Sequence, residues 1–312
     1  MIALRPDDDA YPVALRELHP APDPLWVDGD HRVLARPCVA IVGTRRMSLY
    51  GERVARELGA ALARAGAVVV SGLAQGIDCA AHASAIDTGG ASVAVLGEGI
   101  TAFHANARGR RRRLAIALRA HGALVSPYPP IVPAQGWMFA KRNAVIAGLS
   151  GAVVVAEAPP GSGALITAAE AERLRRPLFA VPGPLGVRTS DGTNALIASG
   201  AARLCLGAEE VARALGLAAT PSQRSGDPVL EALAAGPLEL DALARRTGVD
   251  PGALRARLVA LLFSGAVVDR GDGRFARAPD EPGPPGPDAT GRPTDLNCFS
   301  TDATRGPRWS GP

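Results

Sequence analysis

The chain has 312 residues, a net charge of +4 and a hydrophobic fraction of 47%, which suits a soluble protein with one α/β domain and a smaller partner domain. No apolar run approaches the roughly 20 residues of a membrane span, and the start of the chain turns acidic at once, which argues against a signal peptide. The four scattered cysteines form no CxxC pair. We therefore expect a cytoplasmic protein without a metal site.

The hydrophobic pattern divides the chain into five segments. Residues 1–36 are rich in proline and are expected to form an N-terminal extension that is mostly loop. Residues 37–217 alternate between strand and helix patterns, which predicts a parallel sheet with right-handed crossovers. We expect a linker at 218–226, three helices and a hairpin of the winged-helix type at 227–278, and a disordered tail at 279–312. Strands of the sheet are expected at Val39–Val42, Ala67–Val70, Ser92–Leu96, Ala123–Val125, Ala152–Ala156, Pro177–Val181 and Arg203–Leu206.

Three of these strands run into glycine-rich turns that open helices. The turns begin at Gly43, at Ser71-Gly72 and at Pro159. Ligands of such sheets bind at the carboxyl edge of the strands, where the unpaired N–H groups of helix starts attract anions. Glycines such as Gly72 and Gly76 let a bound group approach the backbone closely. Three turns at one edge predict a site for a row of phosphates rather than for a single mononucleotide.

Basic residues gather in two stretches without acid, between Asp30 and Glu52 and between Glu98 and Glu157. Both stretches flank the predicted carboxyl edge, and charge of one sign at a concave edge indicates a polyanionic ligand. For the run Arg110–Arg113 alone, a solvated surface is an equal alternative. The cations of the two stretches are Arg32, Arg36, Arg45, Arg46, Arg108, Arg110, Arg111, Arg112, Arg113, Arg119, Lys141 and Arg142.

Two aromatic residues precede a basic cluster, although aromatics make up only 4% of the chain. Trp137 and Phe139 stand directly before Lys141, Arg142 and Asn143. Single-stranded nucleic acid is bound by such sets, because a ring stacks on a base, cations hold phosphates and an amide contacts a base edge or a sugar. We interpret Phe139 as a stacking residue and Trp137 as part of the core.

The remaining motifs do not predict catalysis. The segment Leu96–Ala102 matches G-x-G-x-x-A, but no acid for a ribose follows before Glu157, so no NAD site is expected. The phosphate-binding loop of ATP-hydrolysing proteins is missing from the sequence. Ser71 and Ser162 lack a histidine base nearby and are expected to be phosphate or backbone ligands rather than nucleophiles. We expect no catalytic residue, no metal and no cofactor.

These blocks together resemble the DprA/Smf family of DNA-processing proteins. They occur in family order from about Tyr11 to Leu215, and several are long, so the resemblance is specific. The carboxyl-terminal winged helix resembles the one that many members carry. The matching blocks are Val39–Arg45, Ser71–Asp78 with Ala81-His82, Lys141–Asn143 with Ile146–Ser150, Ser162–Ala168, Phe179–Gly183 and Ser190–Ile197.

The resemblance implies a Rossmann-like core with helices on both faces that binds single-stranded DNA as a homodimer, without catalysis. It also implies loading of the RecA recombinase onto incoming strands, and their protection, during natural transformation. The family's amino-terminal helical module is not expected in this chain, and Phe103-His104 replace its usual Tyr-Pro. Carried over by motif, the nucleic-acid-binding residues are Gly43, Thr44, Arg45, Ser71, Gly72, Gln75, Gly76, Phe139, Lys141, Arg142, Asn143, Ser162 and Gly163.

Two alternatives remain at this point. The first is a nucleotide-processing phosphoribohydrolase of the lysine-decarboxylase-like type, whose P-G-G-x-G-T-x-x-E block is only echoed by Pro160–Leu165, with Glu170 off the required spacing. The second is a regulator of duplex DNA, which would read bases through the winged helix. Its expected recognition helix, Ala253–Phe263, carries only Arg255 and Arg257, which is little for base reading.

Overall fold

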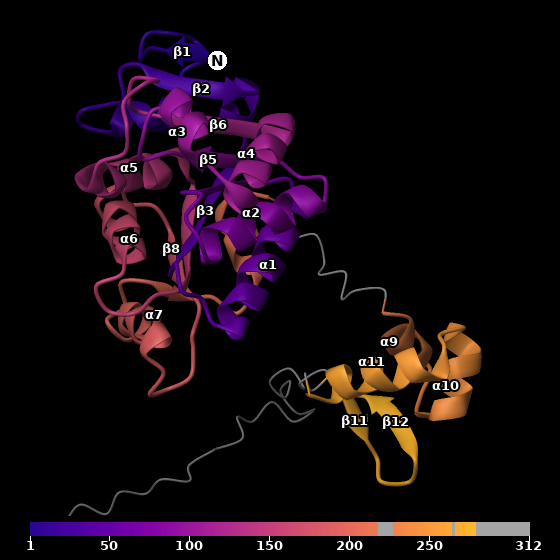
Figure 1. Ribbon diagram of the computed structural model, residues 1–312. Coiled ribbons are helices and arrows are strands. Elements are labelled where there is room, and N and C mark those ends of the chain that lie inside the picture. The colour runs from indigo at the N-terminus through magenta and orange to yellow at the C-terminus, as the bar shows by residue number, and fades with distance from the viewer. Residues whose placement is uncertain (218–226, 264–265, 279–312) are drawn as a thin grey trace, which may run out of the picture. The chain divides into compact units, whose positions relative to one another are not determined.

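The computed structural model describes residues 1–217, 227–263 and 266–278 (Figure 1). The chain forms two compact units, Met1–Gln223 and Arg224–Pro312. The expected linker at 218–226 and the expected tail at 279–312 lie outside the described residues. Among the helices of the described part, none is long and apolar enough to span a bilayer.

The larger unit is built on a nine-stranded sheet with the order β1-β2-β6-β5-β4-β3-β7-β8-β9. All neighbours from β6 to β9 pair in parallel, as the sequence predicts. The chain leaves β3 toward β4 on one side and later returns to β7 on the other, so β3 and β7 form the switch point where such sheets bind ligands. The strands are β1 Ile2–Leu4, β2 Leu25–Gly29, β3 Cys38–Gly43, β4 Val68–Ser71, β5 Ser92–Val95, β6 Gly122–Ser126, β7 Ala152–Glu157, β8 Leu178–Ala180 and β9 Arg203–Leu204.

The N-terminal residues are more ordered than the expected loop. Strand β2 pairs antiparallel with β6, with Trp26 opposite Ser126, and β1 pairs antiparallel with β2. Leu25 and Val27 are both buried, so one side of this short strand completes the core. The proline-rich composition hides this pattern, because a buried strand of five residues gives little periodic signal.

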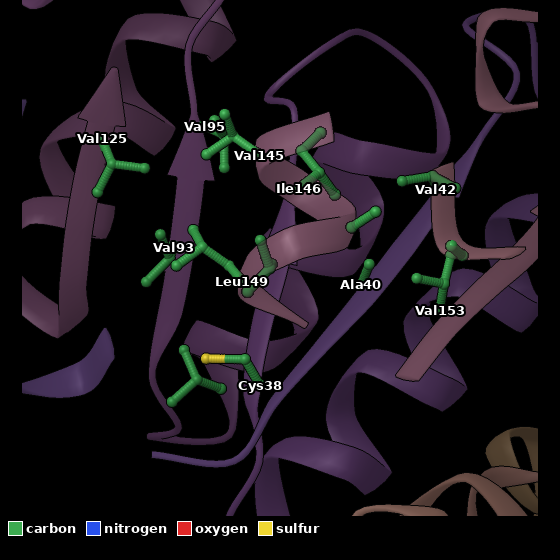
Figure 2. Close-up of a cluster of buried hydrophobic side chains, with 14 of the residues drawn as sticks. Cys38, Ala40, Val42, Val93, Val95, Val125, Val145, Ile146, Leu149 and Val153 are labelled. Atoms are coloured by element: carbon green, nitrogen blue, oxygen red, sulfur yellow. The ribbon is translucent and has the colours of Figure 1, made fainter. Parts of the chain in front are cut away.

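Helices cover both faces of the sheet, as expected (Figure 1). On one face, α1 and α2 pack on a cluster that includes Ile41, Leu62 and Val69. On the other face, Ile146 and Leu149 of α5 pack on the strands, and Figure 2 shows this cluster. The helices of this unit are α1 Leu49–Arg64, α2 Ile77–Asp87, α3 Ile100–Asn106, α4 Gly109–His121, α5 Gly136–Leu149, α6 Gly163–Arg173, α7 Arg188–Ala198 and α8 Ala208–Ala214, with 3-10 turns at Val13–Glu17 and His31–Ala35.

The second unit has the three helices and the hairpin that the sequence predicts for residues 227–278. A short extra strand, β10, pairs with the hairpin to give a three-stranded antiparallel sheet. Leu233, Leu243 and Leu258 lie in its small core. Its elements are α9 Pro228–Leu233, β10 Leu238–Glu239, α10 Leu240–Thr247, α11 Pro251–Phe263, β11 Val267–Asp269 and β12 Arg274–Arg277.

Candidate nucleic-acid interface

The three glycine-rich turns lie side by side at the carboxyl edge of the sheet, because they follow the adjacent strands β4, β3 and β7. The first two turns touch: the Ile77 N–H donates to the Thr44 carbonyl oxygen at 3.3 Å. The third turn is tied to α5 by the Asn143 amide, whose Nδ2 donates to the Gly163 oxygen at 3.0 Å. The structure therefore brings the predicted turns together at one face.

Gly76 shows why this edge requires glycine. Its φ is +85°, in the region that side chains disfavour, and an added Cβ would lie 2.3 Å from the Thr44 oxygen. The two turns can approach this closely only because residue 76 has no side chain.

The amides of the turns are less open than the sequence suggested. The Asp78 carboxylate accepts hydrogen bonds from the N–H groups of Gly72 at 3.1 Å and Ala74 at 3.3 Å. The Glu157 carboxylate accepts from the Ser48 N–H at 2.9 Å, so it occupies the start of α1. By contrast, the N–H groups of Gln75 and Gly76 have no acceptor among the described residues. An anionic ligand at this edge would therefore be contacted mostly by side chains rather than by the amides of these turns.

Arg142 does not point outward as a phosphate contact would. It is 5% exposed, and its Nη1 donates to the Gly72 oxygen at 2.7 Å and to the Val95 oxygen. Burial lowers the pKa of its guanidinium to about 10, although Asp78 acts in the opposite direction. Burial likewise raises the pKa of Asp78 against the effect of Arg142. Arg142 joins the turns after β4 and β5, so we correct its expected role from binding to positioning.

Three other predicted ligands are engaged in contacts within the protein. Ser71 is fully buried, and its Oγ donates to the Ile41 oxygen at 2.7 Å, which ties β4 to β3. Asn143 is 8% exposed and holds the third turn. Ser162 caps α6 by accepting from the Ala164 N–H at 3.3 Å. These side chains shape the edge and leave little that a ligand could contact directly.

Of the remaining predicted side chains, Thr44 is buried and its Oγ1 accepts from the Arg46 N–H at 3.2 Å, whereas the others face solvent. Arg45, Gln75, Lys141 and the neighbouring Arg46 are exposed, and Phe139 is half-buried. The Arg45 Cζ lies 5.9 Å from the centroid of the Phe139 ring, a distance at which a cation and a ring attract each other. The Phe139 ring thus lies near a cation far from it in sequence, as well as near its neighbour Arg142, whose Cζ lies 6.0 Å from the same centroid.

Trp137 is not a core residue, contrary to the sequence interpretation. It is 54% exposed, because the first turn of α5 lies beyond the sheet and only Met138 there is buried. The Tyr128 ring stands edge-on to it, with centroids 6.1 Å apart, and the Lys141 Nζ lies 5.4 Å from its ring centroid. Tyr128 was not predicted as part of the site, although its position in a loop after β6, at the carboxyl edge of the sheet, would have indicated it.

Taken together, the edge offers exposed cations, the exposed Trp137 ring and the half-buried Phe139 ring, while the carboxylates of Asp78 and Glu157 are buried and accept from backbone N–H groups. This chemistry suits a polyanion with unpaired bases. Within the described ranges, no group of three or more His, Cys, Asp or Glu residues is placed to hold a metal ion.

Comparisons with known proteins identify relatives over both units. The family model described as DNA recombination-mediator protein A matches residues 3–216, and the model of the DprA winged helix domain matches residues 216–273. Protein Smf of Escherichia coli (strain K12) is 42% identical over 196 residues, which are 62% of this chain and 52% of that protein. This chain thus spans about half the length of that relative.

Two solved structures of DNA processing protein A are also similar to this chain. The X-ray structure of DNA processing protein A from Streptococcus pneumoniae has a TM-score of 0.62 and 37% identity, over 68% of this chain and 73% of that one. DNA processing protein A from Helicobacter pylori, whose structure was described for its single-stranded DNA binding mode, has a TM-score of 0.59 and 29% identity, over 65% of this chain and 92% of that one.

Proposed function

Because the chain belongs to the DprA/Smf family of DNA-processing proteins, we propose that it binds single-stranded DNA at the carboxyl edge of its larger unit. The observation that carries this proposal is the pairing of solvent-exposed cations with accessible rings, Arg45 with Phe139 and Lys141 with Trp137. Cations hold the phosphates of any nucleic acid, whereas rings stack on bases only where these are unpaired. The related protein from Helicobacter pylori is described as binding single-stranded DNA.

We further propose that the protein acts as a recombination mediator in the cytoplasm. It would protect incoming strands and load the RecA recombinase onto them during natural transformation, as the family resemblance implies. A homodimer fits this role. Leu204 in the outer strand β9 and Leu206 just after it support this, because both are exposed, at 41% and 75%, and are apolar side chains that a second copy of the chain would cover.

The proposed activity is binding without catalysis. A phosphoribohydrolase would need a carboxylate at the glycine turn after β7. Glu170, the acid nearest to that turn in α6, forms an ion pair with Arg173 at 2.8 Å. We expect the protein to release no free base from a nucleoside monophosphate, and release at catalytic rates would contradict the proposal.

The winged helix is not proposed as a reader of duplex DNA. In α11, the Arg257 Nε pairs with the Asp227 carboxylate at 2.6 Å, which leaves Arg255 as the cation of that helix without a carboxylate partner among the described residues. Deleting the residues after Gly226 should leave strand binding by the larger unit intact. Loss of that binding would assign the strand site to the winged helix instead.

The test of the proposed site is the salt dependence of binding. In a plot of the logarithm of the binding constant against the logarithm of the salt concentration, each phosphate contact to a single strand contributes about −0.7 to the slope. The double variant Arg45→Ala, Lys141→Ala should therefore have a shallower slope, by about 1.4. A matched control removes two exposed arginines, Arg64 and Arg213, from the C-terminal turns of α1 and α8. The control should bind like wild type. If the double variant also binds like wild type, the assigned face is wrong.

A further inference from the structure

The four arginines at the start of α4 differ in their surroundings: one is half-buried and engaged in contacts, and three are exposed. Arg111 is half-buried, whereas Arg110, Arg112 and Arg113 are exposed and pair with no carboxylate among the described residues. We propose that Arg110, Arg112 and Arg113 form a second phosphate-binding segment, which holds the continuation of the strand bound at the carboxyl edge. This inference rests on the proposed function and extends it to longer strands.

Arg111 fixes the start of α4 beside the candidate interface. Its Nε donates to the Leu73 oxygen at 3.1 Å, in the turn that also contains Gly72 and Gly76. Its Nη2 lies 3.7 Å from the Glu98 carboxylate, after β5, and its Cζ lies 4.8 Å from the Phe103 ring centroid. The free arginines next to it are therefore held close to the turn after β4, where Gln75 is exposed.

The direction of these side chains favours the same edge. The Cα–Cβ bonds of a helix tilt toward its N-terminus, and α4 begins at Gly109, on the side from which β5 leaves the sheet. Charge near Arg110 also acts on α2, because Arg110 and Arg111 both lower the pKa of the Cys79 thiol against the effect of its burial. The three arginines thus extend the basic surface of Arg45 and Lys141 along α2 and α4.

No carboxylate in the described part of the chain compensates the charge of Arg110, Arg112 and Arg113. The N-terminus of a helix carries partial positive charge and disfavours cations, yet the first turn of α4 contains no acid. The Glu98 carboxylate is buried and already serves Arg111. Phosphates would satisfy this surplus charge, and the planar guanidinium matches their geometry. Since the surplus continues the strand site directly, a longer piece of the same strand is the occupant that fits it.

The proposal is tested by comparing oligothymidylates of about 6 and about 20 nucleotides, one near the lower end of the usual site sizes of single-strand binding proteins and one beyond their upper end. In the triple variant Arg110→Gln, Arg112→Gln, Arg113→Gln, the salt dependence of binding to the longer strand should become shallower. The magnitude of the slope should decrease by about 2, because three contacts contribute about 0.7 each. Binding of the shorter strand should be unchanged. Replacing the same residues by lysine should restore the slope, and the control Arg64→Gln, Arg175→Gln, Arg213→Gln should leave it unchanged.

The outcomes separate this inference from the proposed function. If the triple glutamine variant binds both strands like wild type, the second segment does not exist, while the proposed site stands. If it loses affinity for both lengths equally, the arginines belong to the central site and the extension is wrong. If the wild-type protein binds neither strand, the proposed function itself fails. The triple glutamine variant should melt at the same temperature as wild type or at a higher one, because it removes cations from the start of a helix. A lower melting temperature together with weaker binding of both oligothymidylates would count against the proposal.

Discussion

The Arg142 guanidinium and the Gly72 carbonyl form the link that holds the candidate interface in shape. Nη1 of Arg142 lies 2.7 Å from the Gly72 oxygen, and a Cβ added to Gly72 would lie 2.6 Å from that same nitrogen. The buried Arg142 guanidinium thus holds the turn after β4 by a hydrogen bond, while the neighbouring Lys141 is exposed. We therefore expect these two adjacent basic residues to serve stability and binding separately.

This separation predicts opposite effects for the two residues. Arg142→Lys should lower the free energy of unfolding by about 3 kcal/mol or more, because a shorter ammonium leaves buried carbonyl groups and Asp78 without their partner. Lys141→Ala should change stability by less than about 0.5 kcal/mol and weaken strand binding. Urea unfolding and binding titrations on both variants measure this difference. Equal stability of the two variants would show that Arg142 is not a positioning residue.

The exposed ring of Trp137 should report strand binding directly. With Trp26→Phe and Trp309→Phe in place, Trp137 is the remaining tryptophan, and its fluorescence should be quenched when oligothymidylate binds. Stacking on one base contributes about 1–3 kcal/mol, so Trp137→Ala should weaken binding by about five-fold or more, and Trp137→Tyr should retain most of the affinity. Unaltered emission at saturating strand would remove Trp137 from the site.

The close approach of Gly97 to Phe139 gives a test of that ring that leaves its charge environment intact. A Cβ at residue 97 would lie 2.5 Å from the Phe139 Cδ1, so Gly97→Ala should displace the ring and weaken strand binding. In a Phe139→Ala background the same change should have little further effect, since the displaced group is gone. A double-mutant cycle measures this coupling, and strictly additive losses would show that Gly97 acts on something else.

Much of this architecture could be predicted from the sequence because its signals are local. Valine-rich strands such as Val68–Ser71 and the glycine turn after them show themselves within a few residues. The orientation of a side chain depends on packing, and this is where the predictions differ from the structure. Arg142 and Trp137 both belong to α5, but Arg142 points into the protein and Trp137 points to solvent. A set of cations and rings in sequence does not say which of them point inward.

The turns illustrate the same limit. Asp78 is recognisable as an acid at a helix start, but its two hydrogen bonds to Gly72 and Ala74 depend on the fold of the turn. The strand β2 was not predicted for a related reason, since its partner β6 is about a hundred residues away and β2 joins the sheet only through its pairing with β6, from Trp26–Ser126 to Gly29–Ala123.

His82 makes the larger unit sensitive to acid. It is fully buried, its Nδ1 lies 2.7 Å from the Ser92 Oγ, and burial together with the charge of Arg142 lowers its pKa to about 3. The unfolded chain binds a proton near the ordinary histidine pKa of 6.5 and the folded chain does not, so stability falls as the pH drops from about 6.5 toward 3. Relative to His82→Asn, wild type should lose about 2 kcal/mol more between pH 6.5 and 5. Urea unfolding at the two values checks this, and parallel losses in both proteins would contradict it.

The proposed strand binding is tested most directly by comparing single-stranded and duplex oligonucleotides of equal sequence in gel shifts at two salt concentrations. We expect the wild-type protein to bind the single strand more tightly at both salts, because Phe139 and Trp137 can stack only on unpaired bases, and we expect the affinity to fall as the salt concentration rises. Equal or tighter binding of the duplex, or binding that does not respond to salt, would contradict it.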